Sequence, residues 1–372
     1  MDLFVYGTLR ASRLMTAVAG REAIGTPARL DGYRVVPLGG DAVPMIQPDP
    51  NAITDGVLYA GLDDAQMQRL DLFEGAFGYG LITVTVQTAK GAHVAKMYLP
   101  PDQADVGNGQ WSLEDWQTNH LAPMLHAVDE VFSHDPYPDQ ATLRRMWPMI
   151  EKRAWAKHRA SQMAAPATLR YAPQADDVDM FNFEPPAGQF FRFDAFEVDH
   201  VQFDGTRSGG LNREVFSGTD AAMILPYDPK TDRILLVEQL RLGPAMRGDP
   251  NPWSLEPIAG MVDARETPLE AALREAVEEA GLTISTTEFI TAFYPTPGNT
   301  TDYFTCFLGL CDLPNTKAYQ GGLDSENEDL RLHTLSFDAA MDLIQTAEIT
   351  AGPLITMLFW LEHQRDRLRA TA

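Results

Sequence analysis

The sequence has few cysteines and few positive charges for its length. Only Cys306 and Cys311 are present among 372 residues, so a disulfide framework is excluded and both are expected to be reduced, buried thiols. Lysine and arginine number 29 against 52 aspartate and glutamate residues, which gives a formal net charge of -23. Nucleic acids and anionic membranes are bound through basic patches. The composition therefore argues against both as partners.

Long apolar runs, a secretory leader and several common motifs are also missing. No run of about 18 apolar residues predicts a membrane span, and the start MDLFVYGTLR lacks the basic region and long apolar core of a signal peptide. We therefore expect a cytoplasmic protein. The eight histidines form no cluster with metal-ligand spacing, and there is no Gly-x-Ser-x-Gly, P-loop or dinucleotide-binding pattern.

The chain is long enough for two or three domains, and three regions differ in pattern. Residues 1–102 hold short alternating runs rich in Val, Thr and Tyr, and only LDDAQMQRLDLFEG has helical spacing, which predicts a small β-rich domain. Residues 103–165 predict a helical connector. Strand patterns return over residues 166–372, which end in an apolar-striped helix from about residue 355 to 368.

Residues 260–282, GMVDARETPLEAALREAVEEAGL, carry a strong helix signal. Thr267 is a suitable N-cap, Pro268 a first-turn proline, Glu270 a capping-box acid and Gly281 the residue expected just past a helix C-terminus. A helix from about Pro268 to Ala280 is predicted. Its buried stripe is expected to consist of five apolar residues, namely Leu269, Leu273, Ala276, Val277 and Ala280.

The opposite face of this predicted helix gathers three carboxylates, Glu275, Glu278 and Glu279. Residues three and four apart are neighbours on a helix, so these acids crowd together, with Arg274 able to pair with Glu278. Like charges repel unless a cation lies among them, and Mg²⁺ prefers oxygen ligands shared between carboxylates and phosphates. The alternative is a solvated acidic face. The complete pattern Gly-x5-Glu-x7-Arg-Glu-x-x-Glu-Glu-x-Gly favours the metal site.

This segment is identified as a complete Nudix box, and its flanks resemble the ADP-ribose pyrophosphatase branch of the Nudix hydrolases over residues 185–365. Pro297 lies sixteen residues after Gly281, where such members carry a proline, and GLDSENED (residues 322–329) resembles their acidic loop. The resemblance implies an α/β/α sandwich with an N-terminal antiparallel strand extension. It also implies hydrolysis of ADP-ribose to AMP and ribose 5-phosphate, with related nucleoside diphosphate sugars and other nucleoside diphosphates as alternatives.

The same resemblance assigns roles at the catalytic site. Glu275, Glu279, Glu328 and the backbone carbonyl of Ala259 would ligate Mg²⁺, for which Mn²⁺ could substitute. Glu326 would be the general base that deprotonates the attacking water. Arg274 and Glu278 would complete the catalytic motif.

Substrate recognition and assembly also follow from the resemblance. Arg213 and Arg241 would contact phosphate and nucleoside, as suits the planar donor fork of a guanidinium. Phe190 would stack on adenine. The alternatives are surface cations for the two arginines and a core position for the phenylalanine. Because the N-terminal strands of this branch commonly exchange between subunits, a homodimer is implied.

The first hundred residues resemble the gamma-glutamylcyclotransferase-like fold, a small β-barrel with a cavity. FVYGTLR (residues 4–10) and the later LDLFEGAFGYG carry this resemblance. It implies that backbone donors of the YGTLR loop hold a γ-glutamyl group, with Gly7 allowing close approach, and that Glu74 carries the proton during cyclisation to 5-oxoproline. The loop residues concerned are Tyr6, Gly7, Thr8 and Leu9, and Tyr79 is a second candidate lining residue. A ligand sensor that regulates the Nudix half stays an open alternative.

Overall fold

The computed structural model describes residues 1–39, 42–101, 106–107, 109–314, 318–322 and 328–371. The chain divides into two units, each with hydrophobic cores of its own. The first unit comprises Met1–Phe190 with Asp199–Ser208, and the second comprises Phe191–Val198 with Gly209–Ala372. No described helix is both long and apolar enough to span a lipid bilayer.

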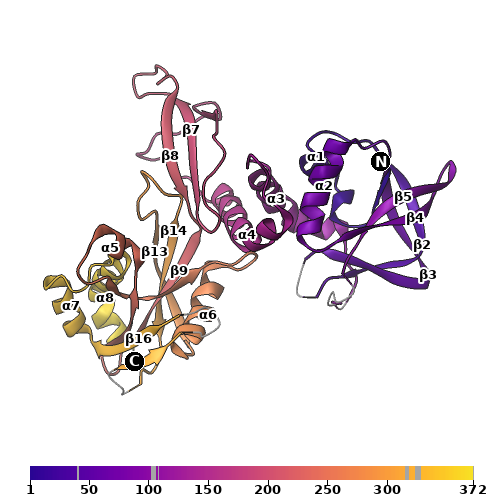
Figure 1. Cartoon of the computed structure of the whole chain (residues 1–372). Coiled ribbons are helices and arrows are strands. Elements are labelled where there is room, and N and C mark those ends of the chain that lie inside the picture. Colours follow the sequence, from indigo (N-terminus) through magenta and orange to yellow (C-terminus); the bar gives the residue numbers. More distant parts are fainter. Residues whose placement is uncertain (40–41, 102–105, 108, 315–317, 323–327, 372) are drawn as a thin grey trace. The chain divides into compact units, whose positions relative to one another are not determined.

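A closed five-stranded barrel begins the first unit (Figure 1). Its strand order is β1-β3-β2-β4-β5, and a parallel contact between Leu3 of β1 and Lys96 of β5 closes it. Phe4, Ile46 and Met97 are fully or almost fully buried inside the barrel. The predicted small β-barrel is therefore confirmed. The strands are β1 (Leu3–Val5), β2 (Gly25–Pro37), β3 (Pro44–Tyr59), β4 (Gly80–Thr88) and β5 (Gly91–Leu99).

Helices pack beside the barrel and complete the first unit. Leu14 and Leu70 are fully buried in a core shared by barrel strands and helices, while Leu143 and Ile150 are fully buried in a second helical core. The segment expected to be a connector is thus part of the first unit, and the boundaries near residues 102 and 165 stay predictions. The elements are η1 (Thr8–Arg10), α1 (Ser12–Ala19), α2 (Asp64–Ala76), α3 (Leu113–Val131), α4 (Gln140–Gln162) and β6 (Val178–Phe181).

The second unit is built on an eight-stranded mixed sheet with an antiparallel hairpin before it in the chain. The main path is β13-β14-β9-β10-β16-β15, with β11 paired to β10 and β12 paired to β9. The hairpin strands are β7 (Arg192–His200) and β8 (Leu211–Ser217). The sheet strands are β9 (Asp220–Asp228), β10 (Arg233–Leu240), β11 (Trp253–Glu256), β12 (Ile258–Met261), β13 (Thr286–Phe293), β14 (Tyr303–Leu310), β15 (Ala318–Gly321) and β16 (Leu330–Ser336).

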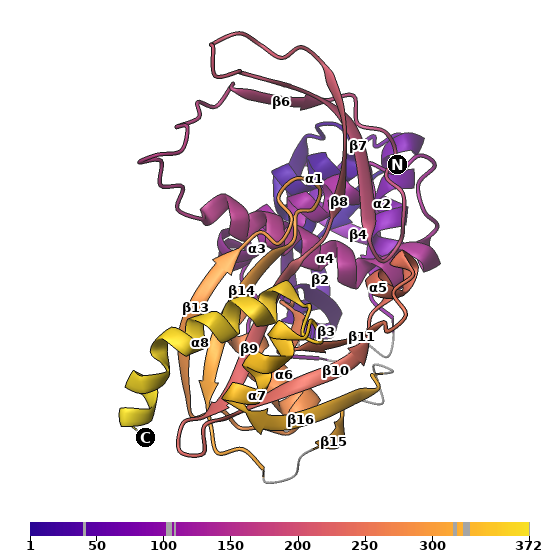
Figure 2. The same cartoon turned by 90° about the vertical axis from the view of Figure 1, so that its left-hand side faces the viewer.

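Helices cover both faces of this sheet, which confirms the expected α/β/α sandwich (Figure 2). On β10, Leu235 and Val237 pack in the core beneath α6 (Pro268–Ala280). Ile234 and Leu236 point the other way, into the core that contains α7 (Phe337–Gln345) and α8 (Gly352–Ala370). This alternation is the period-two pattern of a strand buried on both faces. A short helix, α5 (Leu242–Arg247), follows β10.

The predicted buried stripe of α6 is wrong at one position. Val277 is 56% exposed, whereas Glu279, expected on the open face, is only 3% exposed. The buried side of the helix runs through Ala272 and Ala276 to Glu279. These two alanines are fully buried, and their small side chains let the helix lie close to the sheet. Glu279 is the next residue on the same side of the helix, so it also faces the protein interior.

Both cysteines are free, as expected. Cys306 is buried and Cys311 is partly buried. Burial raises the pKa of Cys306 to about 12 and, with nearby acids, that of Cys311 to about 11. Both thiols are therefore protonated at neutral pH and poorly nucleophilic.

The division into two units predicts that a substitution in one hydrophobic core destabilises only the unit that contains it. Leu70 in the first unit and Leu358 in the second are both fully buried, so Leu70→Ala and Leu358→Ala should each cost about 2–5 kcal/mol. In differential scanning calorimetry of the full chain, each variant should lower a different melting transition. A single transition that both variants shift equally would contradict the division.

Candidate active site

The start and end of α6 are fixed by local hydrogen bonds. The Thr267 hydroxyl accepts the Glu270 N–H at 3.3 Å, and the Glu270 carboxylate accepts the Thr267 N–H at 2.8 Å. Gly281 ends the helix in the left-handed conformation with φ 63°. The predicted helix, capping box and C-terminal glycine are therefore confirmed. Because the register of the helix is fixed, so is the direction in which each carboxylate leaves it.

A close approach between β12 and α6 brings the strand backbone to the carboxylates. A Cβ added at Gly260 would lie 1.7 Å from Oε1 of Glu275, so a larger residue would displace that side chain from its described position. One residue earlier, the backbone N–H of Ala259 donates to the Glu279 carboxylate. Gly260 thus permits the close approach of strand and helix, and the backbone N–H of its neighbour Ala259 binds the Glu279 carboxylate.

Arg274 connects the strand-to-helix loop with the acids of α6. Its Nε donates to Glu266 at 3.0 Å, and its Nη1 donates to Glu275 at 2.7 Å and to Glu278 at 2.8 Å. Its Nη2 donates to the Met261 carbonyl at 3.2 Å. The predicted Arg274–Glu278 pair is confirmed. The arginine therefore positions three carboxylates and holds the loop that leads into the helix.

Glu279 is a buried carboxylate with an unsatisfied oxygen. Its Oε2 has no hydrogen-bond partner in the described structure, although burying an unpaired charge is costly. Burial, followed by the charges of Glu275 and Glu328, raises the pKa of Glu279 to about 9. Burial also raises the pKa of Glu275. Carboxylates from α6 and from the segment before β16 are thus brought together without enough positive charge among them.

The donor chemistry of this cluster suits a divalent cation. Oxygen ligands in a desolvated carboxylate cluster match the preference of Mg²⁺, and a cation would satisfy the free oxygen of Glu279. In the described side-chain positions, however, no three acidic, histidine or cysteine residues converge closely enough to hold one ion. Glu275 is turned toward Arg274 instead. Binding would therefore require Glu275 to move away from that ion pair.

Arg241 lies beside the same cluster and is held by an acid that the sequence analysis missed. Its Nε donates to Glu256 at 2.9 Å and its Nη2 pairs with the same carboxylate. The bonds to Glu256, and then the charges of Glu279 and Glu328, raise the pKa of Arg241. Glu256 could have been found as the acid in the strand directly before the box.

The other candidate substrate residues lie on exposed segments. Pro297 is in the loop between β13 and β14, and Arg213 is on β8, where its Nη1 donates to the Asn212 carbonyl at 2.8 Å. Within the described residues Arg213 forms no ion pair with the carboxylates. Phe190 belongs to the first unit, is 54% exposed, and its carbonyl accepts a bond from Arg153. Glu326, the expected base, lies outside the described residues.

The first unit has a separate group of candidate residues around the barrel. Gly7, with φ -110° and ψ -138°, joins β1 to η1, which contains Thr8 and Leu9. An added Cβ at Gly7 would lie 2.9 Å from a side-chain carbon of Pro44. Tyr6 is 5% exposed, and burial, then Tyr79 and Glu74, raises its pKa. These three side chains therefore share one neighbourhood.

Glu74 near the end of α2 is a desolvated carboxyl group, and within the described residues its side chain forms no hydrogen bond. Burial raises its pKa from 4.5 to about 7, which suits a group that gains and loses a proton at neutral pH. The sequence analysis missed a pair beside it, in which the Tyr98 hydroxyl donates to Asp71 at 2.6 Å. The signal was available, because Asp71 precedes Glu74 by one helical turn.

Comparison with known proteins assigns families to the two parts of the chain. The family model described as "Gamma-glutamyl cyclotransferase, AIG2-like" matches residues 3–118, and that described as "NUDIX domain" matches residues 218–356.

Curated relatives match about half of the chain's length. An ADP-ribose pyrophosphatase of Escherichia coli (strain K12) is 32% identical over 207 residues, which are 56% of this chain and 98% of that protein. One from Haemophilus influenzae is 32% identical over 188 residues, covering 50% and 86%. A GDP-mannose pyrophosphatase of Escherichia coli O139:H28 is 29% identical over 171 residues, covering 45% and 88%.

The part of the chain that matches the NUDIX domain model contains the carboxylate cluster and the arginine that organises it. The chain belongs to the Nudix hydrolase family and carries a gamma-glutamyl cyclotransferase, AIG2-like domain ahead of its Nudix domain.

Proposed function

We propose that the second unit hydrolyses the diphosphate of ADP-ribose to AMP and ribose 5-phosphate. The observation that carries this proposal is the buried, unpaired oxygen of Glu279 beside Glu275, Glu328 and Arg241. The choice of ADP-ribose is supported by the similarity to two ADP-ribose pyrophosphatases. The similarity to a GDP-mannose pyrophosphatase favours related nucleoside diphosphate sugars as the second candidates.

In this proposal Glu275, Glu279, Glu328 and the Ala259 carbonyl would hold Mg²⁺, with Mn²⁺ as a substitute. When bound, the cation would offset the charge of the diphosphate and polarise it. Arg274 keeps the acids of α6 in position before binding. Nη1 of Arg274 donates to both Glu275 and Glu278. Glu278 would therefore still hold the arginine when Glu275 turns to the ion.

Arg241 would bind a phosphate oxygen. Glu256 occupies its Nε and Nη2 and holds the guanidinium plane in one orientation, which leaves the remaining donors for substrate. Deprotonation of the attacking water is assigned to Glu326 on the resemblance alone. In this proposal Arg241 binds the substrate, and Glu326 of the acidic loop accepts the proton.

Assembly and compartment are proposed on separate observations. Phe191, directly before β7, is 52% exposed, and Phe193 on β7 is 43% exposed. Exposed aromatic surface of this kind is typical of an interface. We therefore propose a homodimer formed through the Nudix half. The two free thiols support a reducing compartment such as the cytoplasm.

Replacing the unpaired carboxylate should remove most of the Nudix activity. Glu279→Gln keeps the shape of the side chain but weakens it as a metal ligand, so kcat for ADP-ribose should fall at least about 100-fold. The measurement is AMP release with Mg²⁺ across a panel of nucleoside diphosphate sugars. Glu362→Gln, which alters an exposed acid of α8, is the matched control. Wild-type inactivity toward the whole panel would overturn the proposal.

For the first unit we propose binding of a γ-glutamyl compound at the YGTLR loop, with Glu74 as the proton carrier. The grouping of Glu74 with Tyr6 and Tyr79 supports this proposal, as does the match of residues 3–118 to the cyclotransferase family model. A sensor that binds the same compound without turnover is the second candidate. Formation of 5-oxoproline by wild type, and its loss in Glu74→Gln, would favour the enzyme.

Glu74 should also make the stability of the first unit depend on pH. The folded state holds the proton more tightly than the unfolded state, so stability falls as pH rises from about 4.5 and levels off above about 7. Glu74→Gln removes the buried charge and should stabilise this unit by up to about 3 kcal/mol at pH 8, but not at pH 4. Calorimetry at both pH values measures this difference.

The control for this experiment is Glu22→Gln, because Glu22 is exposed in the same unit. It should change the melting temperature equally at both pH values. A Glu74→Gln effect that is the same at pH 4 and pH 8 would show that Glu74 titrates normally.

A further inference from the structure

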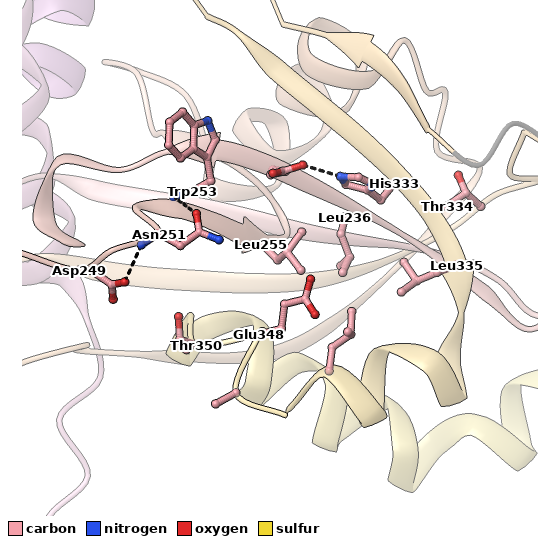
Figure 3. A pocket seen from close by; sticks show the side chains of 13 residues that line it. Leu236, Asp249, Asn251, Trp253, Leu255, His333, Thr334, Leu335, Glu348 and Thr350 are labelled. Carbon is pink, nitrogen blue, oxygen red and sulfur yellow. Dashed lines mark hydrogen bonds and ion pairs between the residues drawn. The ribbon is translucent and has the colours of Figure 1, made fainter. Parts of the chain in front are cut away.

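A cavity of about 380 Å³ lies in the second unit, on the sheet face that carries α7 and α8 (Figure 3). Leu236 and Leu255 line it and belong to the core on that face. The Nudix helix α6 packs on the opposite face. The cavity is therefore separated by the sheet from the carboxylates assigned to diphosphate hydrolysis. Its volume is in the range of small-molecule sites.

The polar lining of this cavity has more negative than positive charge. Glu238, Asp249 and Glu348 contribute carboxylates. Of these, Glu238 pairs with Arg331 at 3.2 Å and also contacts the His333 ring at 2.7 Å. Among the described residues neither Asp249 nor Glu348 forms an ion pair. An anionic ligand such as a phosphate would be repelled, whereas a cation would be attracted.

The end of α7 adds to this negative potential. Ala347, Glu348 and Thr350, which line the cavity, follow the C-terminus of this nine-residue helix. The dipole of a helix leaves partial negative charge at its C-terminus, which favours cations. Ala347 adopts the left-handed conformation, with φ 61°, which is unfavourable for a residue with a side chain. It belongs to the turn that ends α7, in which the N–H groups of Ala347 and Glu348 donate to the carbonyls of Ile344 and Leu343, and this turn places Glu348 at the cavity.

An exposed aromatic side chain lies on another side of the cavity. Trp253 of β11 is 54% exposed and lines the cavity together with Asn251. Figure 3 shows Leu255 between Trp253 and Glu348. An indole face attracts organic cations, and leucine side chains accept the carbon chain of such a ligand. The lining thus combines an aromatic face, an apolar floor and carboxylates that form no ion pair among the described residues, although Asp249 accepts the Asn251 N–H at 3.0 Å.

We propose that this cavity binds a small organic cation with a protonated amine on an alkyl chain. The ammonium group is held by Glu348 and Asp249, and the alkyl chain packs on Leu236 and Leu255 beside Trp253. A second cavity, of about 780 Å³, shares Trp253, Asn251 and Glu238 with the first. It extends to Asp329, directly before β16, so a longer amine has room beyond the first cavity.

The test is titration calorimetry of the full chain with 1,4-diaminobutane at fixed ionic strength. We expect one saturable site, which Trp253→Leu and Glu348→Gln each weaken about tenfold. Trp253 is half-exposed and Glu348 is exposed, so both variants should fold. Glu362→Gln, which removes an exposed charge elsewhere in the same unit, should leave the affinity unchanged. The neutral analogue 1,4-butanediol should not bind.

Other outcomes would overturn the inference. Absence of a saturable site for 1,4-diaminobutane would do so directly. Equal weakening by Glu348→Gln and Glu362→Gln would mean that the amine only neutralises the acidic surface of a chain with net charge -23. Equal affinity for 1,4-butanediol would mean that the cavity recognises hydroxyl groups instead. None of these results depends on diphosphate hydrolysis.

Discussion

The close docking of α6 on β12 is the constraint on which the proposed chemistry depends. Gly260 leaves room for Glu275, the Ala259 N–H reaches Glu279, and Arg274 ties the acids to the loop before the helix. Any larger residue at Gly260 would displace the Glu275 side chain. The same closeness excludes water from Glu279 and raises its pKa. The result is a cluster of carboxylates whose burial and mutual repulsion are unfavourable without a cation. Binding a metal ion would relieve that repulsion.

The two units use carboxyl groups in different electrostatic settings. In the second unit, acids from α6 and from the segment before β16 meet, so mutual repulsion adds to burial. In the first unit, burial alone accounts for the raised pKa of Glu74. A crowded cluster suits a cation, whereas a single desolvated acid suits proton transfer. The contrast follows from how many acids each fold brings to one place.

Local patterns predicted much of this architecture. Thr267, Pro268 and Gly281 mark both ends of α6 correctly, because capping is a matter of residues next to one another in the chain. The barrel and the sandwich were expected from runs typical of strands and from family resemblance. The error at Val277 has a physical cause. Periodicity identifies an apolar stripe, but the angle at which a helix meets its sheet depends on the side chains across the contact.

The sequence by itself determined the helix, its caps, the arginine–glutamate pair on it and the family of each half, since these depend on short spacings. Only the tertiary structure decided that Glu279 is buried with a free oxygen, that Glu256 orients Arg241, and that Tyr98 bonds to Asp71. It also decided that Trp253, Glu348 and Asp249 line one cavity. These groups come from separate elements, and strand pairing and helix packing bring them together.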